Sequence, residues 1–145
     1  MIDPKRIFID TSAWVELMLK GEKYHQEVSS YFTNEDRKGS IFFTNDYVLD
    51  ETWTRLLTWQ GLFYAKSLRK KTREAQKVLK LNIIWTDENI FNRSWKNFEK
   101  FGEHKLSFTD AVITTVVKDL RIDEILTLDA GFQKVGFTVK PDIRQ

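Results

Sequence analysis

A chain of 145 residues that is 41% hydrophobic and 14% aromatic is large enough to bury one core, so we expect a single domain spanning residues 1–145. The absence of cysteine excludes disulfides, thiolate zinc sites and a cysteine nucleophile. No apolar stretch approaches the roughly 20 residues that cross a bilayer, so we expect a cytoplasmic protein without a membrane partner. The net charge of +2 indicates no partner by itself.

The first third of the chain alternates strands with helices. A strand is predicted at residues 6–10, followed by a helix at 12–20 that Thr11 or Ser12 caps and Gly21 ends. A second helix runs to about residue 35. Residues 41–44 form a short buried strand, and the helix after it carries Glu51 and ends before Gly61.

Residues 62–81 have the pattern of an amphipathic surface helix. One side is apolar, and the other is strongly basic. The apolar positions are Leu62, Ala65, Leu68, Ala75 and Leu79. Between residues 66 and 80 the local charge is +6, so the rest of the chain sums to −4. A basic stripe therefore faces an acidic remainder.

The second half continues the alternation. We predict a strand at 82–85, a helix from Thr86 or Asp87 to about residue 101, a helix at 107–120, a strand at 125–128 and an edge strand at 137–139. Parallel neighbouring strands need helical crossovers. This order therefore predicts an α/β protein, a three-layer α/β/α sandwich with a mostly parallel central sheet of four or five strands.

Four acids stand where strands end or helices begin: Asp10, Glu51, Asp110 and Asp129. In open α/β sheets ligands bind outside the carboxyl ends of the strands, where Asp10 and Asp129 directly end apolar runs. Four carboxylates in a partly desolvated cleft repel one another unless a cation neutralises them, and hard oxygen ligands suit Mg²⁺ or Mn²⁺. We therefore hypothesise a metal-dependent nuclease in which all four acids bind the metal and act in catalysis.

Each acid also has an ordinary structural explanation. Asp10 can cap a helix, Asp110 can form a capping box with Ser107, Asp129 can be a turn residue, and Glu51 can be a solvated helix position. None of the four is decisive alone. Three of them converge on one edge of the expected fold, and that coincidence favours the site.

Four blocks of sequence surround these acids: FIDTSAW at 8–14, TNDYVLDET at 44–52, LSFTDA at 106–111 and LTLDAGF at 126–132. In this order they resemble the PIN-domain family, specifically the short VapC-type toxin ribonucleases. The resemblance implies a PIN-like fold and a Mg²⁺- or Mn²⁺-dependent endoribonuclease that cleaves RNA phosphodiester bonds by metal-activated water. It further implies the toxin of a type II toxin-antitoxin pair, with a cognate antitoxin and a homodimeric state.

The same resemblance assigns the acidic quartet to Asp10, Glu51, Asp110 and Asp129. It favours Glu51 over the adjacent Asp50, although the phase of the helix decides which of the two faces the site. We expect four hydroxyl side chains to orient carboxylates or phosphate oxygens, or to cap helices, namely Thr11, Ser12, Ser107 and Thr109.

The basic stripe matches no motif of the family. RNA phosphates are one partner for it, and a solvated helix or an antitoxin-docking surface are the alternatives. The residues expected to contact RNA are Lys66, Arg69, Lys70, Arg73 and Lys77. We expect Trp14, Trp53 and Trp85 in the core or a dimer interface, and Trp59 at the surface.

Two other classes of function use α/β folds of this kind. A non-catalytic RNA- or protein-binding module would use the same fold and keep the acids as caps. A phosphoacceptor regulator or an aspartate phosphatase is disfavoured, because Thr11 and Ser12, not a second acid, follow Asp10.

Overall fold

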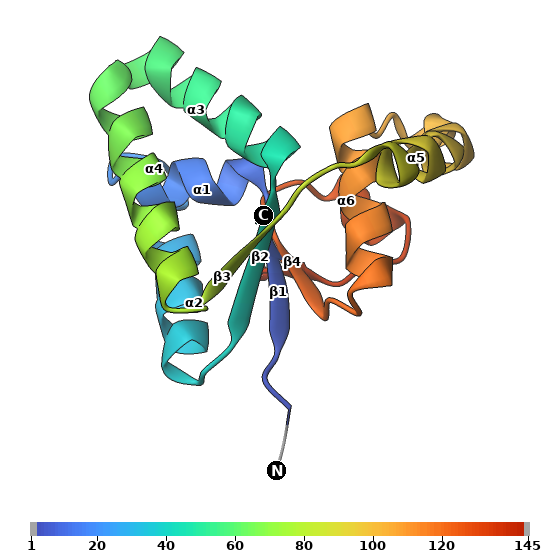
Figure 1. Ribbon diagram of the computed structural model, residues 1–145. Coiled ribbons are helices and arrows are strands. Elements are labelled where there is room, and N and C mark those ends of the chain that lie inside the picture. The colour runs from blue at the N-terminus through green and yellow to red at the C-terminus, as the bar shows by residue number, and fades with distance from the viewer. Residues whose placement is uncertain (1–2, 144–145) are drawn as a thin grey trace.

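Five parallel strands form one sheet in the computed structural model, which describes residues 3–143 (Figure 1). The strands are β1 (Arg6–Ile9), β2 (Ile41–Asn45), β3 (Leu81–Ile84), β4 (Glu124–Leu126) and β5 (Val139–Lys140). Their spatial order is β3-β2-β1-β4-β5, and every neighbouring pair is parallel. The predicted α/β class and parallel sheet are therefore confirmed.

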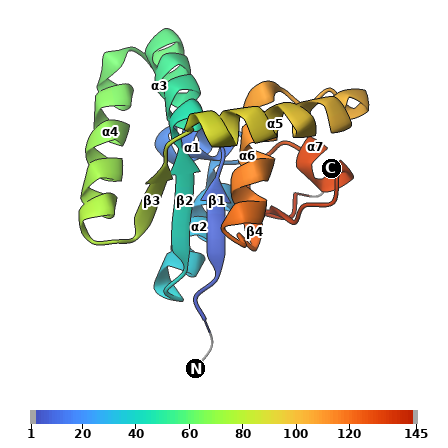
Figure 2. The same ribbon diagram turned by 45° about the vertical axis from the view of Figure 1, so that its right-hand side comes forward.

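Helices cover both faces of the sheet. Figure 1 shows α1 (Thr11–Met18), α2 (His25–Arg37), α3 (Asp46–Gln60) and α4 (Leu62–Lys77) on one face. The opposite face carries α5 (Glu88–Lys100) and α6 (Phe108–Asp119), seen in Figure 2 from a second side. The short elements are a 3₁₀ turn, Gly102–His104, and α7 (Gly131–Lys134). Within residues 3–143, no helix is both long and apolar enough to span a membrane.

The order of the strands reverses at the centre of the sheet. The chain moves outward from β1 to β2 and β3, and it then crosses to β4 on the other side of β1. The carboxyl ends of β1 and β4 therefore flank the switch point, which is where ligands bind in open α/β sheets.

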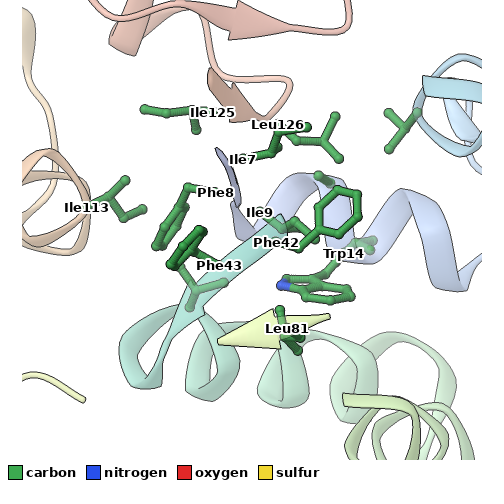
Figure 3. Close-up of a cluster of buried hydrophobic side chains, with 14 of the residues drawn as sticks. Ile7, Phe8, Ile9, Trp14, Phe42, Phe43, Leu81, Ile113, Ile125 and Leu126 are labelled. Atoms are coloured by element: carbon green, nitrogen blue, oxygen red, sulfur yellow. The ribbon is translucent and has the colours of Figure 1, made fainter. Parts of the chain in front are cut away.

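The core lies on both faces of β1, β2 and β4 (Figure 3). Partners in register share a face, so Phe8, Phe43 and Ile125 point together toward Ile113 of α6. On the other face Phe42 packs toward Trp14 of α1. Strands buried on both faces read as continuous apolar runs, which is why β1, β2 and β4 were predictable.

The prediction of one helix over residues 62–81 is wrong at its end. The helix stops at Lys77, and Leu81 is the buried first residue of β3. The break occurs at Leu79, whose φ is +60° and whose side chain is 81% exposed. Leu62 is also exposed, so the apolar side of the helix is narrower than the sequence suggests.

Other predicted element boundaries differ from the structure by one or two residues. The first strand ends at Ile9, its helix spans Thr11–Met18, and the edge strand lies at Val139–Lys140 instead of 137–139. Trp85 follows β3 and is 69% exposed, so a core position for it is excluded. Trp14 is buried and Trp59 is exposed, as predicted.

Candidate active site

The pairing of β1 with β4 brings the first and last acids to the same edge. Ile9 pairs with Leu126, and the backbone N–H of Asp10 donates to the Leu126 carbonyl at 3.0 Å. Asp10 comes directly after β1, and Asp129 comes three residues after β4. The fold thus places two residues that are distant in sequence at the switch point of the sheet.

Asp10 is buried and fixed by two hydrogen bonds. Its Oδ1 accepts from the backbone N–H of Thr11 at 2.7 Å, so it is the N-cap of α1. Its Oδ2 accepts from the hydroxyl of Thr127 at 2.8 Å. Both carboxylate oxygens are held in place, and each keeps a lone pair for a further ligand.

Thr127 links the two strand ends. Its Oγ1 accepts from the backbone N–H of Asp129 at 3.0 Å and lies 3.1 Å from the hydroxyl of Ser12. The Ser12 hydroxyl in turn accepts from the backbone N–H of Leu128 at 2.9 Å. Because the single proton of Thr127 goes to Asp10, Ser12 must donate to Thr127 while Asp10 is ionised. The chain of hydroxyls therefore couples the positions of Asp10 and Asp129.

The first turn of α6 holds Asp110. The Ser107 hydroxyl accepts from the Asp110 backbone N–H at 3.0 Å, and Asp110 Oδ2 accepts from the Ser107 backbone N–H at 3.0 Å. This is the capping box that the sequence allows. Capping occupies one lone pair of one carboxylate oxygen, so it is compatible with a second role for Asp110.

Asp129 also has a local structural role. Its Oδ1 accepts from the backbone N–H of Gly131 at 2.8 Å, which fixes the turn before α7. A side chain at position 131 has little room there, since a Cβ would lie 2.8 Å from Leu106 Cδ2 and 3.0 Å from Asp129 Oδ1. The turn thus holds the carboxylate through a close approach that glycine permits.

The phase of α3 turns Glu51 toward the other acids. The charge of Glu51 acts on both Asp10 and Asp110, whereas Asp50 is exposed. Glu51 Oε1 lies 3.6 Å from Nη2 of Arg55, one helical turn later. A pocket of about 420 Å³ opens beside this pair, lined by Tyr47, Asp50, Glu51, Thr54, Arg55 and Thr109.

The electrostatics tie the four acids into one cluster. Burial raises the pKa of Asp10 to about 7, and the charges of Asp110 and Glu51 add to the rise, against the hydrogen bonds from Thr127 and Thr11. Burial likewise raises the pKa of Asp110, with added repulsion from Asp129 and Glu51. These repulsions place Asp110 and Glu51 near Asp10, and Asp129 near Asp110, although the four acids come from separate segments.

The donor set suits a hard cation. All four side chains offer carboxylate oxygens, which are the ligands that Mg²⁺ and Mn²⁺ prefer. Within residues 3–143, however, no three His, Cys, Asp or Glu side chains converge closely enough to hold an ion by themselves. This arrangement fits an ion that keeps several of its waters and contacts only one or two carboxylates directly.

The four predicted supporting hydroxyls have different surroundings. Ser107 caps α6, and Ser12 acts on the carboxylates through Thr127. Thr11 orients Asp10 with its backbone, while its own hydroxyl is buried without a hydrogen-bond partner. Thr109 lines the pocket beside Glu51.

Two further side chains of the site, Thr127 and Arg55, are not among the residues predicted from the sequence. Thr127 lies in an apolar run, where a threonine is an ordinary strand residue. Its partner Asp10 is 117 residues away, so only the register of β1 against β4 reveals the contact. For Arg55 a signal existed, namely its spacing of four residues from Glu51 on one helix.

The basic helix α4 lies at the outer edge of its helical layer, packed against α3 and the edge strand β3 (Figure 1). The side chains expected to contact RNA are exposed: Lys66, Arg69, Lys70, Arg73 and Lys77. Lys80 lies outside the helix and pairs with Asp36 at 3.0 Å.

Comparison with known proteins identifies the fold and the family. Two solved structures share the fold. VapC20 of Mycobacterium tuberculosis, described as a sarcin-ricin loop cleaving toxin, matches with a TM-score of 0.78 at 24% identity over 91% of this chain and 96% of its own. VapBC2 of Rickettsia felis bound to promoter DNA matches with a TM-score of 0.66 at 13% identity over 93% and 97%.

The chain belongs to the PIN domain family, whose model matches residues 7–138. In sequence it is 26% identical over 140 residues to the 23S rRNA-specific endonuclease VapC20 of Mycobacterium tuberculosis. That alignment covers 94% of this chain and 99% of VapC20. It is also 26% identical over 155 residues to Ribonuclease VapC6 of Methanocaldococcus jannaschii, covering 94% and 96%. The family resemblance predicted from the four sequence blocks is therefore confirmed.

Proposed function

We propose that this protein is a divalent-cation-dependent endoribonuclease and the toxin of a toxin-antitoxin pair. The observation that supports the proposal is that acids from four separate segments influence one another beside the switch point of the sheet: the charges of Asp110 and Glu51 act on Asp10, and those of Asp129 and Glu51 act on Asp110. The similarity to VapC20 and VapC6, both named as nucleases acting on RNA, supports the choice of substrate.

The side chains of this site position charge. Asp10 is held by Thr11 and Thr127, and Asp110 is held by Ser107, so neither carboxylate has to be ordered when a cation or substrate arrives. A bound Mg²⁺ or Mn²⁺ would supply Lewis acidity toward the scissile phosphate and a water of lowered pKa. The Glu51 side chain is half exposed and, within residues 3–143, makes only the long contact with Arg55, so it is less restrained than the carboxylates of Asp10 and Asp110.

A cognate antitoxin and a second copy of the chain are the proposed protein partners. The similarity to the VapBC2 toxin-antitoxin complex supports the first. Several large apolar side chains are exposed on α5, on the segment between β3 and α5, and around the α3–α4 corner. Their burial in a dimer interface would be favourable, which supports the second partner. They are Leu57, Trp59, Leu62, Phe63, Trp85, Phe91 and Trp95.

RNA cleavage with Mg²⁺, with Mn²⁺ and with EDTA tests the proposal. We expect the wild type to cut only with metal, and Asp10→Asn and Asp110→Asn to stay folded and inactive. The matched control is Asp119→Asn at the far end of α6, which should stay active.

Wild-type cleavage in EDTA, or an active Asp110→Asn, would contradict the assignment. Metal-independent RNA binding by a wild type that never cuts would favour the alternative, a binding module whose acids serve as caps.

A further inference from the structure

We propose that the pocket beside Glu51 is a nucleotide subsite, and that Arg55 binds the RNA phosphate next to the scissile one. This inference rests on the proposed function, because it assumes an RNA substrate. The pocket has a volume of about 420 Å³ and is formed by α3 and by Thr109 at the start of α6. Glu51 lines the pocket, so an RNA strand bound at the acids would also reach the pocket.

Substrate binding needs a positive charge at this place. Four carboxylates repel a polyanion, and the exposed Asp50 adds a further negative charge at the pocket. Arg55 is the one basic side chain among the residues that line the pocket. A guanidinium group matches two phosphate oxygens at once, which an ammonium group does not.

Arg55 is held loosely, which leaves it available. Its contact with Glu51 is 3.6 Å long, and both side chains are about two-fifths exposed, at 43% and 41%. Exposed pairs at this spacing change an equilibrium constant by only about twofold. By contrast, Arg93 makes two hydrogen bonds to Asp119, at 2.9 and 2.7 Å, as expected of an arginine that joins two helices.

The walls of the pocket suit the rest of a nucleotide. The half-buried ring of Tyr47 lines the pocket, 6.3 Å from the ring of Phe108, and offers a face for a base. The hydroxyls of Thr54 and Thr109 line the same space and can donate to phosphate or ribose oxygens. Arg55 itself lies 6.0 Å from the centroid of the Trp59 ring, at the outer limit of a cation–π contact, so this ring does not hold it away from a phosphate.

The proposal predicts opposite effects at two neighbouring positions. Arg55→Gln removes the phosphate ligand, so it should raise KM by about tenfold and leave kcat nearly unchanged. Asp50→Asn removes a like charge from the pocket, so it should tighten RNA binding. Arg55→Gln also removes the ion pair that Arg55 makes with Glu51. The affinity of this variant for Mn²⁺ should therefore equal that of the wild type or exceed it by about twofold.

Three measurements test this assignment. Binding of a labelled single-stranded RNA is measured in the Asp110→Asn background over a range of salt concentrations, cleavage kinetics are measured in the active background, and Mn²⁺ binding is titrated. We expect Arg55→Gln to reduce the slope of log K against log salt by about 0.7, the value for one phosphate contact on a single strand. Arg55→Lys should recover part of the affinity. The control is Arg37→Gln, an exposed arginine at the end of α2.

An unchanged KM and salt slope in Arg55→Gln would overturn the subsite, even with a fully active wild type. Loss of Mn²⁺ affinity in step with loss of cleavage would also overturn it, because Arg55 would then act only by orienting Glu51. A wild type that binds RNA through Arg55 without cutting it would refute the proposed function and retain the subsite.

Discussion

Replacing Asp10 by asparagine is expected to stabilise the metal-free protein at alkaline pH. Folding raises the pKa of this carboxyl from 3.8 to about 7, mainly by burial. Each pKa unit corresponds to about 1.4 kcal/mol, so ionised Asp10 lowers the stability of the fold by about 4 kcal/mol above pH 7. Asparagine carries no charge and can still accept one of the two hydrogen bonds, so we expect a gain of about 2 to 4 kcal/mol.

The hydroxyl chain explains why asparagine fits. When an amide replaces Oδ2, the Thr127 hydroxyl can turn to accept from it and donate to Ser12, 3.1 Å away. The other oxygen of the side chain keeps the bond from the Thr11 backbone. The substitution therefore removes the charge and keeps one hydrogen bond at each of the two side-chain positions.

The direction of the pH dependence follows from proton binding. In the unfolded chain Asp10 ionises near 3.8, whereas in the folded protein it stays protonated until about 7. Between these values the unfolded state binds fewer protons, so stability falls as pH rises and levels off above the folded pKa. The raised pKa of Asp110 adds a contribution of the same sign.

Urea unfolding in EDTA measures this effect. Between about pH 5.5 and about pH 8.5 the wild type should lose about 2 kcal/mol through Asp10, and Asp10→Asn should lose much less. Asp50→Asn, which removes an exposed carboxylate from the same region, is the control and should resemble the wild type. Equal pH dependence in wild type and Asp10→Asn would refute the reasoning.

Three further outcomes are expected. Replacing four basic residues of α4 by glutamine should weaken binding to all RNA sequences and lower the salt slope by about 0.7 per lost contact, and an unchanged slope would point to a protein interface instead. The four are Arg69, Lys70, Arg73 and Lys77. Gly131→Ala should lower kcat/KM by about tenfold, because its Cβ would lie 2.8 Å from Leu106 Cδ2 and 3.0 Å from Asp129 Oδ1, so that the leucine side chain must move and the carboxylate shifts. Lys5→Met should cost about 1 to 2 kcal/mol in urea unfolding, since Lys5 lies 3.4 Å from buried Glu35 and 3.1 Å from buried Glu124 while its own side chain is 38% exposed.

The sequence predicted the sheet well wherever burial alone decides the structure. β1, β2 and β4 are buried on both faces, so their residues form continuous apolar runs. The two-residue strand β5 depends on pairing with β4 and has no such local signal. The end of α4 also lacks a local signal in the sequence. The chain turns at Leu79, which adopts a positive φ, and this conformation is usually found at glycine or asparagine.

The acids of the candidate site were predictable because strand ends and helix starts are visible in the sequence. The groups that hold them were not. Thr127 reaches Asp10 only after two strands pair, and Arg55 reaches the pocket only because α3 has a particular phase beside α6. The exposure of Trp85 likewise depends on where β3 ends, which the apolar run around it does not reveal.

Calorimetric titration of Mn²⁺ into the RNA-free protein tests the central claim most directly, since the claim is that four acids from four segments form one cation site. The wild type should bind Mn²⁺ saturably, and Asp10→Asn and Asp110→Asn should each weaken binding by about tenfold or more. The variant with all four acids replaced by their amides should not bind. A wild type without saturable binding, or a fourfold variant that binds as well as the wild type, would contradict the account and leave the acids as helix caps and turn residues.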